Sequence, residues 1–263
     1  MRLHLVQLDI RWEDAEANCR RVAELLDAAH PDPGDLVILP EMFDTGFSFN
    51  TAATVDQGRT LAFLMLQATS RQVYMHGHRT ASASGNSTEA AARNRATAIS
   101  PDGTILAEYD KIHLFSIGGE SQRLSSGTHT TTYQIADAGA TFNVFPAICY
   151  DLRFPELFRG PRIGTLDLIA IGACWPAKRA AHFRALSIAR AIENQSFMAF
   201  CNRTGNDPAP TNTTYSGGSL VIDPLGNVLA EADEREQVLS VSIDLTAARN
   251  WREQFPAWRD AKH

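Results

Sequence analysis

The chain has 263 residues, and 44% of them are hydrophobic, so it can bury a large core. Its formal net charge is −6, with acidic and basic residues intermixed, and this pattern offers no basic stripe to nucleic acid or to an anionic membrane surface. We therefore expect a single domain over residues 1–263, with neither a nucleic-acid nor a membrane partner.

The start of the chain and its cysteines indicate a cellular compartment. MRLHLVQLDI leads directly into a strand pattern and lacks the apolar core of a signal peptide, and no apolar run approaches the length that spans a bilayer. The four cysteines have no CxxC spacing, which favours reduced thiols over disulfides or a zinc site. These features predict a soluble, cytoplasmic protein.

The first half of the chain alternates helix and strand patterns. Residues 14–30 place apolar side chains at helical spacing and acidic residues in the first turn, which predicts an amphipathic helix. DLVILPEMF then predicts a short strand covered on both faces, with Glu41 at its end. We expect next a helix over residues 61–71, the strand VYMHGHR, a polar loop over residues 82–88, the strand ATAIS and a Pro-Asp-Gly hairpin.

The second half of the chain repeats this order. DLVILPE is echoed by DLIAIGA, and a helix expected over residues 180–194 leads into SFMAFCNR as the earlier helix leads into VYMHGHR. ISPDGTILAEYDK, residues 99–111, also aligns without gaps to IDPLGNVLAEADE, residues 222–234. The sequence therefore contains two copies of an αβαβ-plus-hairpin unit.

The duplication predicts the architecture. Each copy can form a mixed sheet with helices on one face. The other, apolar faces of the two sheets are buried most simply by packing against each other. We expect an α/β fold, a four-layer α-β-β-α sandwich. Lys111 ends the first hairpin, and the equivalent position of the second copy is Glu234. This difference suggests a functional role for Lys111. The alternative is an ordinary surface lysine.

The segment FNVFPAICYDLRFPELFR, residues 142–159, presents Cys149. Its apolar strand pattern stops at Cys-Tyr-Asp, before Pro155 and Glu156 open an expected helix. A sharp strand-to-helix turn exposes one side chain and places the Tyr150 N–H beside it, where an amide at a helix entrance can stabilise an anion. This is the layout of a nucleophile elbow, although a free cysteine is also commonly a small buried hydrophobe.

Glu41, Lys111 and Cys149 all lie at or just past strand ends. Such ends gather at one rim of layered α/β proteins, where sites usually form. A free cysteine has a pKa of about 8.5, so it needs a base or a nearby cation to act as a nucleophile. Glu41 can take the proton, and Lys111 can favour the anion and, with the Tyr150 N–H, hold the oxyanion of a tetrahedral intermediate.

Four segments in order, PEMFDTGF, DKIHLFSIGGES, ICYDLRFPELFR and ARAIENQ, resemble the nitrilase (carbon-nitrogen hydrolase) superfamily over essentially the whole chain. The resemblance implies a catalytic triad of Glu41, Lys111 and Cys149 on an α-β-β-α sandwich that assembles as a homodimer. It also implies a second glutamate, matched by Glu120 in GGES, which assists in placing water or substrate.

Within the superfamily, FSIGGES, CYDLRFPE and IDPLGNVLAE are most similar to the omega-amidases. Those enzymes hydrolyse the terminal amide of 2-oxoglutaramate or 2-oxosuccinamate to the dicarboxylic 2-oxo acid and ammonia. The resemblance thus implies a small-molecule amide substrate and a thioester on Cys149, and we expect no cofactor. Nitrilases, carbamoylases and deaminated-glutathione amidases share the triad, so they stay open as alternatives.

Binding such a substrate requires a cation for its far carboxylate. Arg153, four residues past the nucleophile, is the first candidate, with Lys178 and Arg179 behind it, and an ion pair of Arg153 with Asp151 or Glu156 is the alternative. Phe43 and Trp175 are candidate pocket walls or ordinary core residues. Cys174 precedes the Trp-Pro pair where related omega-amidases have Asn or Ser, which leaves the exact substrate open.

Other histidines and cysteines allow competing interpretations. His113 lies two residues past Lys111 and can share its strand face, so a Cys-His acyltransferase or papain-like site is possible. Pairing of Cys149 with Cys174 would instead indicate a redox or interaction protein. His76 and His78 lack a third nearby ligand, so we predict no metal site.

The C-terminal segment NWREQFPAWRDAKH carries three aromatic residues in a charged setting, Trp251, Phe255 and Trp258. Large apolar rings favour burial. The segment is therefore expected either to cover a neighbouring subunit or to fold back onto its own domain.

Overall fold

The structure, a computed structural model, describes residues 1–82, 92–159 and 164–262, so all but the first residue of the predicted loop over residues 82–88 lies outside it. Two six-stranded mixed sheets dominate the fold, with the strand orders β14-β1-β2-β3-β4-β5 and β13-β12-β9-β8-β7-β6. The strands of the first sheet are β1 (Arg2–Gln7), β2 (Leu36–Ile38), β3 (Tyr74–Ala81), β4 (Arg93–Ile99), β5 (Ile105–Asp110) and β14 (Gln237–Ser242).

The second sheet and a small hairpin complete the strands. The second sheet contains β6 (Tyr133–Asp137), β7 (Ala140–Ile148), β8 (Leu168–Ala173), β9 (Phe197–Asn202), β12 (Leu220–Ile222) and β13 (Val228–Glu231). The hairpin pairs β10 (Thr204–Asn206) with β11 (Thr214–Ser216). The helices are α1 (Ala15–Ala29), α2 (Thr51–Thr54), α3 (Arg59–Arg71), α4 (Ala180–Asn194) and α5 (Thr246–Gln254).

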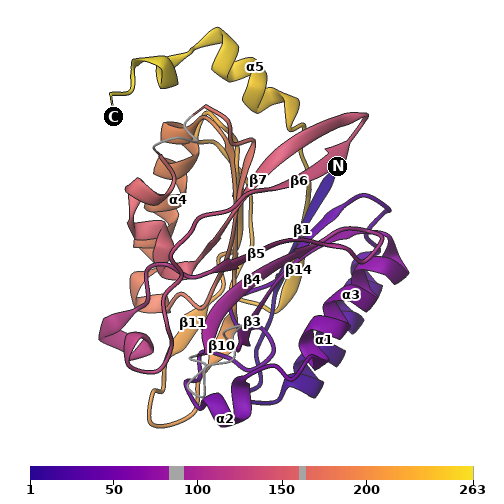
Figure 1. Ribbon diagram of the computed structural model, residues 1–263, viewed down its shortest axis with the longest axis vertical. Coiled ribbons are helices and arrows are strands. Elements are labelled where there is room, and N and C mark those ends of the chain that lie inside the picture. The colour runs from indigo at the N-terminus through magenta and orange to yellow at the C-terminus, as the bar shows by residue number, and fades with distance from the viewer. Residues whose placement is uncertain (83–91, 160–163, 263) are drawn as a thin grey trace.

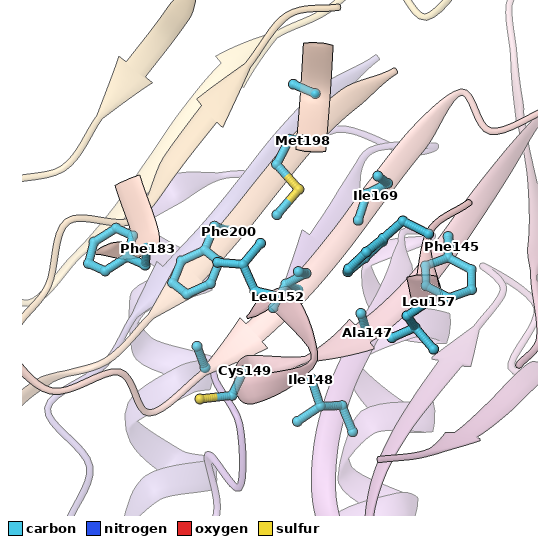
Figure 2. Packing of buried hydrophobic residues seen from close by; sticks show 14 of the residues in the cluster. Phe145, Ala147, Ile148, Cys149, Leu152, Leu157, Ile169, Phe183, Met198 and Phe200 are labelled. Atoms are coloured by element: carbon cyan, nitrogen blue, oxygen red, sulfur yellow. The ribbon is translucent and has the colours of Figure 1, made fainter. Parts of the chain in front are cut away.

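Helices cover the outer faces of both sheets, and the predicted four-layer sandwich is confirmed. In Figure 1, α1 and α3 lie on one side of the strands and α4 on the other. Three apolar clusters correspond to the three interfaces between layers: α1 and α3 pack on the first sheet, the two sheets pack on each other, and α4 packs on the second sheet. Figure 2 shows this last cluster, in which Cys149 lies.

The internal duplication is confirmed by the topology. In the first sheet β1, β2 and β3 are parallel and β4 and β5 follow antiparallel, and β7, β8, β9, β12 and β13 repeat this pattern in the second. The aligned hairpins even share an irregularity, because the pairing register shifts at Ala98/Ile99 and again at Val221/Ile222. The copies differ most after their first strand, where the first copy has α1 and the described residues of the second copy form short 3-10 turns.

The helix predicted to open at Pro155 and Glu156 is not formed. Two 3-10 turns, η3 (Cys149–Arg153) and η4 (Pro155–Leu157), take its place. A residue before proline is biased toward extended backbone, and Phe154 adopts φ −110° and ψ 93°, which interrupts the helical run. The predicted sharp turn after β7 is nevertheless present at Cys149.

The C-terminal segment folds back onto the second sheet. Arg252 donates to the Leu166 carbonyl at 2.6 Å and pairs with the buried carboxylate of Asp167 at 2.6 Å. Gly164 leaves room for the Trp258 ring, since a Cβ there would lie 2.5 Å from it. Of the two expectations for this segment, the structure shows the intramolecular one, although Phe255 stays 55% exposed.

Asp44, in the turn that follows Glu41, is fully buried and accepts a hydrogen bond from the Thr60 hydroxyl at 2.8 Å. Burial raises the pKa of its carboxyl to about 7, with the charge of Asp56 adding to the rise and that of Arg79 opposing it. A native pKa above the unfolded value means that the folded state binds the proton more tightly, so this carboxyl favours folding more at pH 5 than at pH 8.

We therefore expect Asp44→Asn to flatten the pH dependence of stability. The gain in unfolding free energy between pH 8 and pH 5 should be about 2 kcal/mol smaller in the variant than in the parent. Urea unfolding at both pH values measures this difference. Asp102→Asn is the control, because that carboxyl is exposed and its pKa is lowered, so it does not titrate in this range. Equal pH dependence in parent and Asp44→Asn would contradict the expectation.

Candidate active site

Cys149 lies in a strained turn at the end of β7. Its backbone φ is +44°, in the left-handed region, which costs a non-glycine residue about 1–2 kcal/mol. Its exposed fraction is 8%, and it lines a cavity of about 410 Å³. The turn also places Tyr150 at the start of η3, where backbone N–H groups have no partner within the helix.

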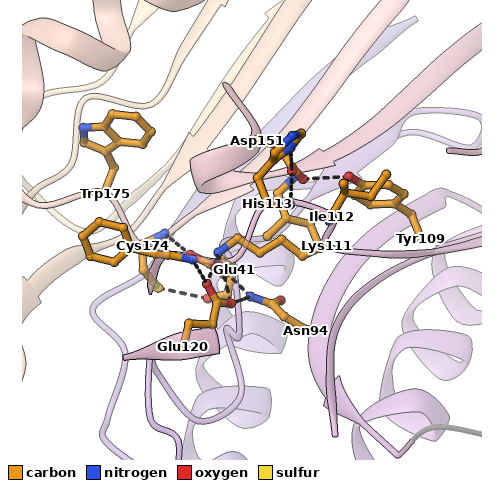
Figure 3. Close-up of polar contacts among 12 residues, drawn as sticks. Glu41, Asn94, Tyr109, Lys111, Ile112, His113, Glu120, Asp151, Cys174 and Trp175 are labelled. Carbon is orange, nitrogen blue, oxygen red and sulfur yellow. Dashed lines mark hydrogen bonds and ion pairs between the residues drawn. The ribbon is translucent and has the colours of Figure 1, made fainter. Parts of the chain in front are cut away.

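The buried carboxylate of Asp151 holds this turn in place. It accepts hydrogen bonds from the Ile148 N–H at 3.1 Å and the Tyr109 hydroxyl at 2.8 Å. It also accepts one from the His113 N–H at 3.0 Å, which connects the Cys149 turn to the segment just past Lys111 (Figure 3). One side chain thus links the chain segments that carry Cys149 and Lys111.

Four side chains from distant parts of the chain meet beneath this turn (Figure 3). The Lys111 Nζ lies 2.6 Å from Glu41 Oε1 and 2.8 Å from Glu120 Oε2. The Asn94 amide donates to Glu41 at 2.7 Å and to Glu120 at 2.9 Å, and so bridges the two carboxylates. All four side chains are buried, which leaves two carboxylates, one ammonium and one amide in mutual contact.

The second oxygen of Glu41 is held from the other sheet. The Cys174 N–H donates to Glu41 Oε2 at 3.0 Å, and the Cys174 thiol donates to the Glu41 carbonyl at 3.1 Å. These contacts join the ends of β2 and β8, the two strands that the duplication makes equivalent. Sequence reasoning did not identify Asn94 or this backbone amide, because Asn94 occupies an ordinary strand position and a main-chain N–H has no residue signature.

Burial and charge set the protonation of these groups. Burial raises the pKa of the Cys149 thiol well above its usual value, and the charge of Glu41 raises it further, while Lys111 opposes the rise. For Lys111, burial alone would lower the pKa, but the charges of Glu120 and Glu41 outweigh it and raise the pKa well above the ordinary value. The resting site therefore holds a neutral thiol beside an ammonium, so attack by sulfur requires a base.

The cavity above Cys149 has aromatic walls and basic side chains. Arg153, Lys178 and Arg179 line it, and none of them forms an ion pair with another residue in the described part of the chain. The Arg153 guanidinium lies 4.8 Å from the Trp175 ring centroid and donates to His182 at 3.2 Å. The other residues that line the cavity are Trp12, Phe47, Ser48, Phe49, Phe115, Ile117, Gly118, Tyr150, Cys174, Pro176, Asp207, Thr211, Thr213 and Tyr215.

Of the residues suggested for substrate contact, Tyr150, Arg153 and Trp175 line the cavity and Phe43 does not. Phe43 is fully buried in the cluster between the first sheet and its helices, with its ring centroid 6.2 Å from that of Phe63. The cause is local, since the chain turns immediately after Glu41 and Met42 adopts φ +45°. Phe43 is therefore a core residue.

The three histidines considered above as catalytic or metal-binding residues, His113, His76 and His78, have structural roles. The His113 ring stacks on Phe154 at 3.8 Å, and its Nδ1 lies 2.9 Å from Asp151. Burial lowers the pKa of His76 to about 3 and that of His78 well below its usual value, so both rings are neutral. Among the described residues, no three histidine, cysteine or acidic side chains converge as a metal would require, and no helix there is long and apolar enough to cross a bilayer.

Comparison with known proteins adds the family. The profile described as carbon-nitrogen hydrolase matches residues 2–253. The chain belongs to the carbon-nitrogen hydrolase family. It is 35% identical to the omega-amidase YafV of Yersinia enterocolitica over 262 residues, covering 99% of this chain and 96% of that protein. It is 32% identical to a 2-oxoglutaramate amidase of Bacillus subtilis, covering 98% of this chain and 96% of the relative.

A solved carbon-nitrogen hydrolase has the same fold. XC1258 from Xanthomonas campestris, described as a CN-hydrolase superfamily protein with an arsenic adduct in the active site, superposes with a TM-score of 0.88 at 36% sequence identity. The match covers 100% of this chain and 97% of that one. Together with the named amidases, it shows that this carbon-nitrogen hydrolase is an amidohydrolase.

Proposed function

We propose that this amidohydrolase cleaves the terminal amide of a small 2-oxo dicarboxylic acid monoamide, such as 2-oxoglutaramate or 2-oxosuccinamate, to the dicarboxylate and ammonia. The observation that carries the proposal is the contact of the Lys111 ammonium with the Glu41 carboxylate at 2.6 Å beneath the Cys149 turn. The names of the relatives, omega-amidase and 2-oxoglutaramate amidase, support the choice of substrate.

In the first half of the proposed reaction, Glu41 takes the Cys149 proton and the sulfur attacks the amide carbon. The electron pair of the carbonyl π bond moves onto the oxygen. The resulting oxyanion receives hydrogen bonds from the Lys111 ammonium and the Tyr150 N–H. The intermediate collapses when the C–N bond breaks. Glu41 returns its proton to the leaving nitrogen, ammonia departs, and an acyl thioester on Cys149 is left.

In the second half, Glu41 removes a proton from water, and the resulting hydroxide attacks the thioester carbon. A second oxyanion forms at the same place. Its collapse breaks the C–S bond, the sulfur recovers its proton from Glu41, and the dicarboxylate is released. Because Glu41 acts as base and acid in turn, the hydrogen bonds from Asn94 and from the Cys174 N–H, which hold it in place, matter for both halves.

Glu120 keeps Lys111 in position in this scheme. It accepts two hydrogen bonds from the ammonium, at 2.8 and 3.1 Å, and one from the Phe115 N–H at 2.7 Å. Its pKa is raised by burial, while Lys111 opposes the rise. The ammonium thus faces the oxyanion from a fixed position without a direct part for Glu120 in the bond changes.

Three cations that line the cavity, Arg153, Lys178 and Arg179, form no ion pair with a carboxylate among the described residues, which supports a substrate with a carboxylate at its far end. Arg153 is preferred, because its guanidinium lies over Trp175 and lines the cavity that contains Cys149. The alternative, an ion pair of Arg153 with Asp151 or Glu156, is not formed. The Asp151 oxygens instead accept hydrogen bonds from Tyr109, His113 and Ile148. Arg153 is therefore available to an anionic ligand.

A substrate panel tests the proposal. Ammonia release is measured with 2-oxoglutaramate, a carbamoyl-amino acid and a simple nitrile at equal concentrations. We expect kcat/KM to be highest for 2-oxoglutaramate by about 100-fold, because the other two lack either the primary amide or the far carboxylate at the right distance. Fast turnover of the nitrile alone would overturn the proposal.

We further propose that residues 1–263 form one catalytic domain and that the protein is a cytoplasmic homodimer. Both halves contribute to the site, which supports a single catalytic unit. The four free thiols are typical of a reducing compartment. An apolar surface patch near the C-terminal segment, with Ile192 at 50% and Leu225 and Phe255 at 55% exposure, supports self-association.

A further inference from the structure

Asp207 is the only carboxylate among the described residues that line the cavity. It is almost fully buried, and both of its oxygens are occupied. Oδ1 pairs with the Arg203 guanidinium at 2.7 Å, and Oδ2 accepts a hydrogen bond from the Tyr215 hydroxyl at 2.7 Å. Asp207 therefore adds no free negative charge to the cavity.

The hairpin β10-β11 carries this group of residues. Arg203 is fully buried just before β10, with its guanidinium 4.3 Å from the ring centroid of Tyr215 in β11. It also donates to the Ile10 and Thr204 carbonyls, both at 3.1 Å. Guanidinium, carboxylate and phenol thus brace one another, and Asp207 has little freedom to turn toward a ligand.

The other charged groups make the cavity positive. Arg153, Lys178 and Arg179 line it without ion pairs among the described residues. The buried carboxylates behind Cys149, Glu41 and Glu120, are both paired with Lys111. This arrangement attracts a bound anion. An ammonium would lose its water and find no carboxylate with a free oxygen among the described residues that line the cavity.

We infer that the Arg203–Asp207–Tyr215 group is a specificity determinant. Arg203 and Tyr215 bind both oxygens of the one carboxylate among the described lining residues that could pair with a substrate α-ammonium, so the site accepts the ω-amides of 2-oxo acids and excludes those of 2-amino acids. The inference rests on the proposed amidase function. It assigns the discrimination to a group that takes no part in the bond changes and acts through charge at carbon 2 of the substrate.

The test compares three amides that differ only at carbon 2, which carries a carbonyl in 2-oxoglutaramate, an ammonium in L-glutamine and only hydrogens in glutaramate. In the parent, kcat/KM for glutamine should be lower than for 2-oxoglutaramate by about 100-fold or more, because like charges are brought together. Glutaramate should be hydrolysed readily. In Tyr215→Phe, one Asp207 oxygen loses its partner and can accept from the ammonium, so the ratio of 2-oxoglutaramate to glutamine should fall by about tenfold.

Tyr109→Phe is the matched control. It also removes a tyrosine hydrogen bond from a buried aspartate, Asp151, but neither residue lines the cavity. It should change all three rates by the same factor and leave the ratio at the parent value. An unchanged ratio in Tyr215→Phe, or a parent enzyme that hydrolyses glutamine as fast as 2-oxoglutaramate, would overturn the inference while leaving amidase activity established.

A second readout does not depend on amide hydrolysis. Modification of Cys149 is followed by peptide mass spectrometry with 2-sulfonatoethyl and 2-aminoethyl methanethiosulfonate, an anion and a cation, each normalised to its rate with a small thiol in solution. In the parent, the normalised rate of Cys149 modification should be about tenfold higher with the anionic reagent than with the cationic one. In Tyr215→Phe, the ratio of these two rates should be smaller. If none of the three amides is cleaved, the proposed function fails, and equal reaction of the two reagents then separately refutes the inferred charge selection.

Discussion

Cys149→Ala is expected to reduce ammonia release from 2-oxoglutaramate by about 10⁴-fold or more, because without the sulfur no thioester can form and water must attack the amide directly. The side chain is small and lies in a turn whose Ile148 N–H donates to the Asp151 carboxylate, a contact that the variant keeps, so the fold should persist. Steady-state ammonia assays measure the loss, and thermal unfolding checks the fold.

Cys201→Ala is the matched control for the proposed nucleophile, Cys149. Cys201 is also a buried free thiol, but it lies between the two sheets, does not line the cavity, and donates to the Val6 carbonyl at 3.3 Å. Its loss should cost stability and leave kcat near the parent value. Parent-level ammonia release by Cys149→Ala would end the thioester mechanism.

Lys111→Met should have a double effect. Activity should fall by about 10³-fold, because an oxyanion donor is lost and the charges of Glu41 and Glu120 face each other without a cation. Stability should also fall by about 3–5 kcal/mol, since removing one partner of a buried ion pair leaves uncompensated charge. Ammonia assays and urea unfolding measure the two effects on the same preparation.

A second variant separates these two effects. In Lys111→Met with Glu120→Gln, one of the two uncompensated carboxylates is gone, so part of the stability should return while activity stays lost. Arg79→Met is the control for a buried cation outside the site, where Arg79 pairs with Asp56 and Glu108. It should lower stability and spare kcat. Recovery of activity together with stability in the double variant would show that Lys111 is only structural.

Most of the secondary-structure elements could be predicted from patterns within short segments of the sequence. The Asp14 cap of α1, the strand DLIAIGA and the paired hairpins are encoded in short segments, whose periodicity and turn residues determine the element directly. The internal repeat then implied two equivalent sheets and a sandwich. The helix predicted to open at Pro155 was wrong for a local reason. The residue before a proline prefers extended backbone, so Phe154 is extended and two 3-10 turns form instead.

By itself, the sequence determined the elements, the duplication and the positions of Glu41, Lys111 and Cys149 near strand ends. Only the tertiary structure decided that Asn94 bridges the two glutamates, that the Cys174 amide holds Glu41, and that Asp207 is neutralised by Arg203 and Tyr215. It also decided that Phe43 belongs to the core. The reason is that secondary structure follows from neighbours along the chain, whereas a polar contact depends on the register and facing of strands that the packing of two sheets fixes together.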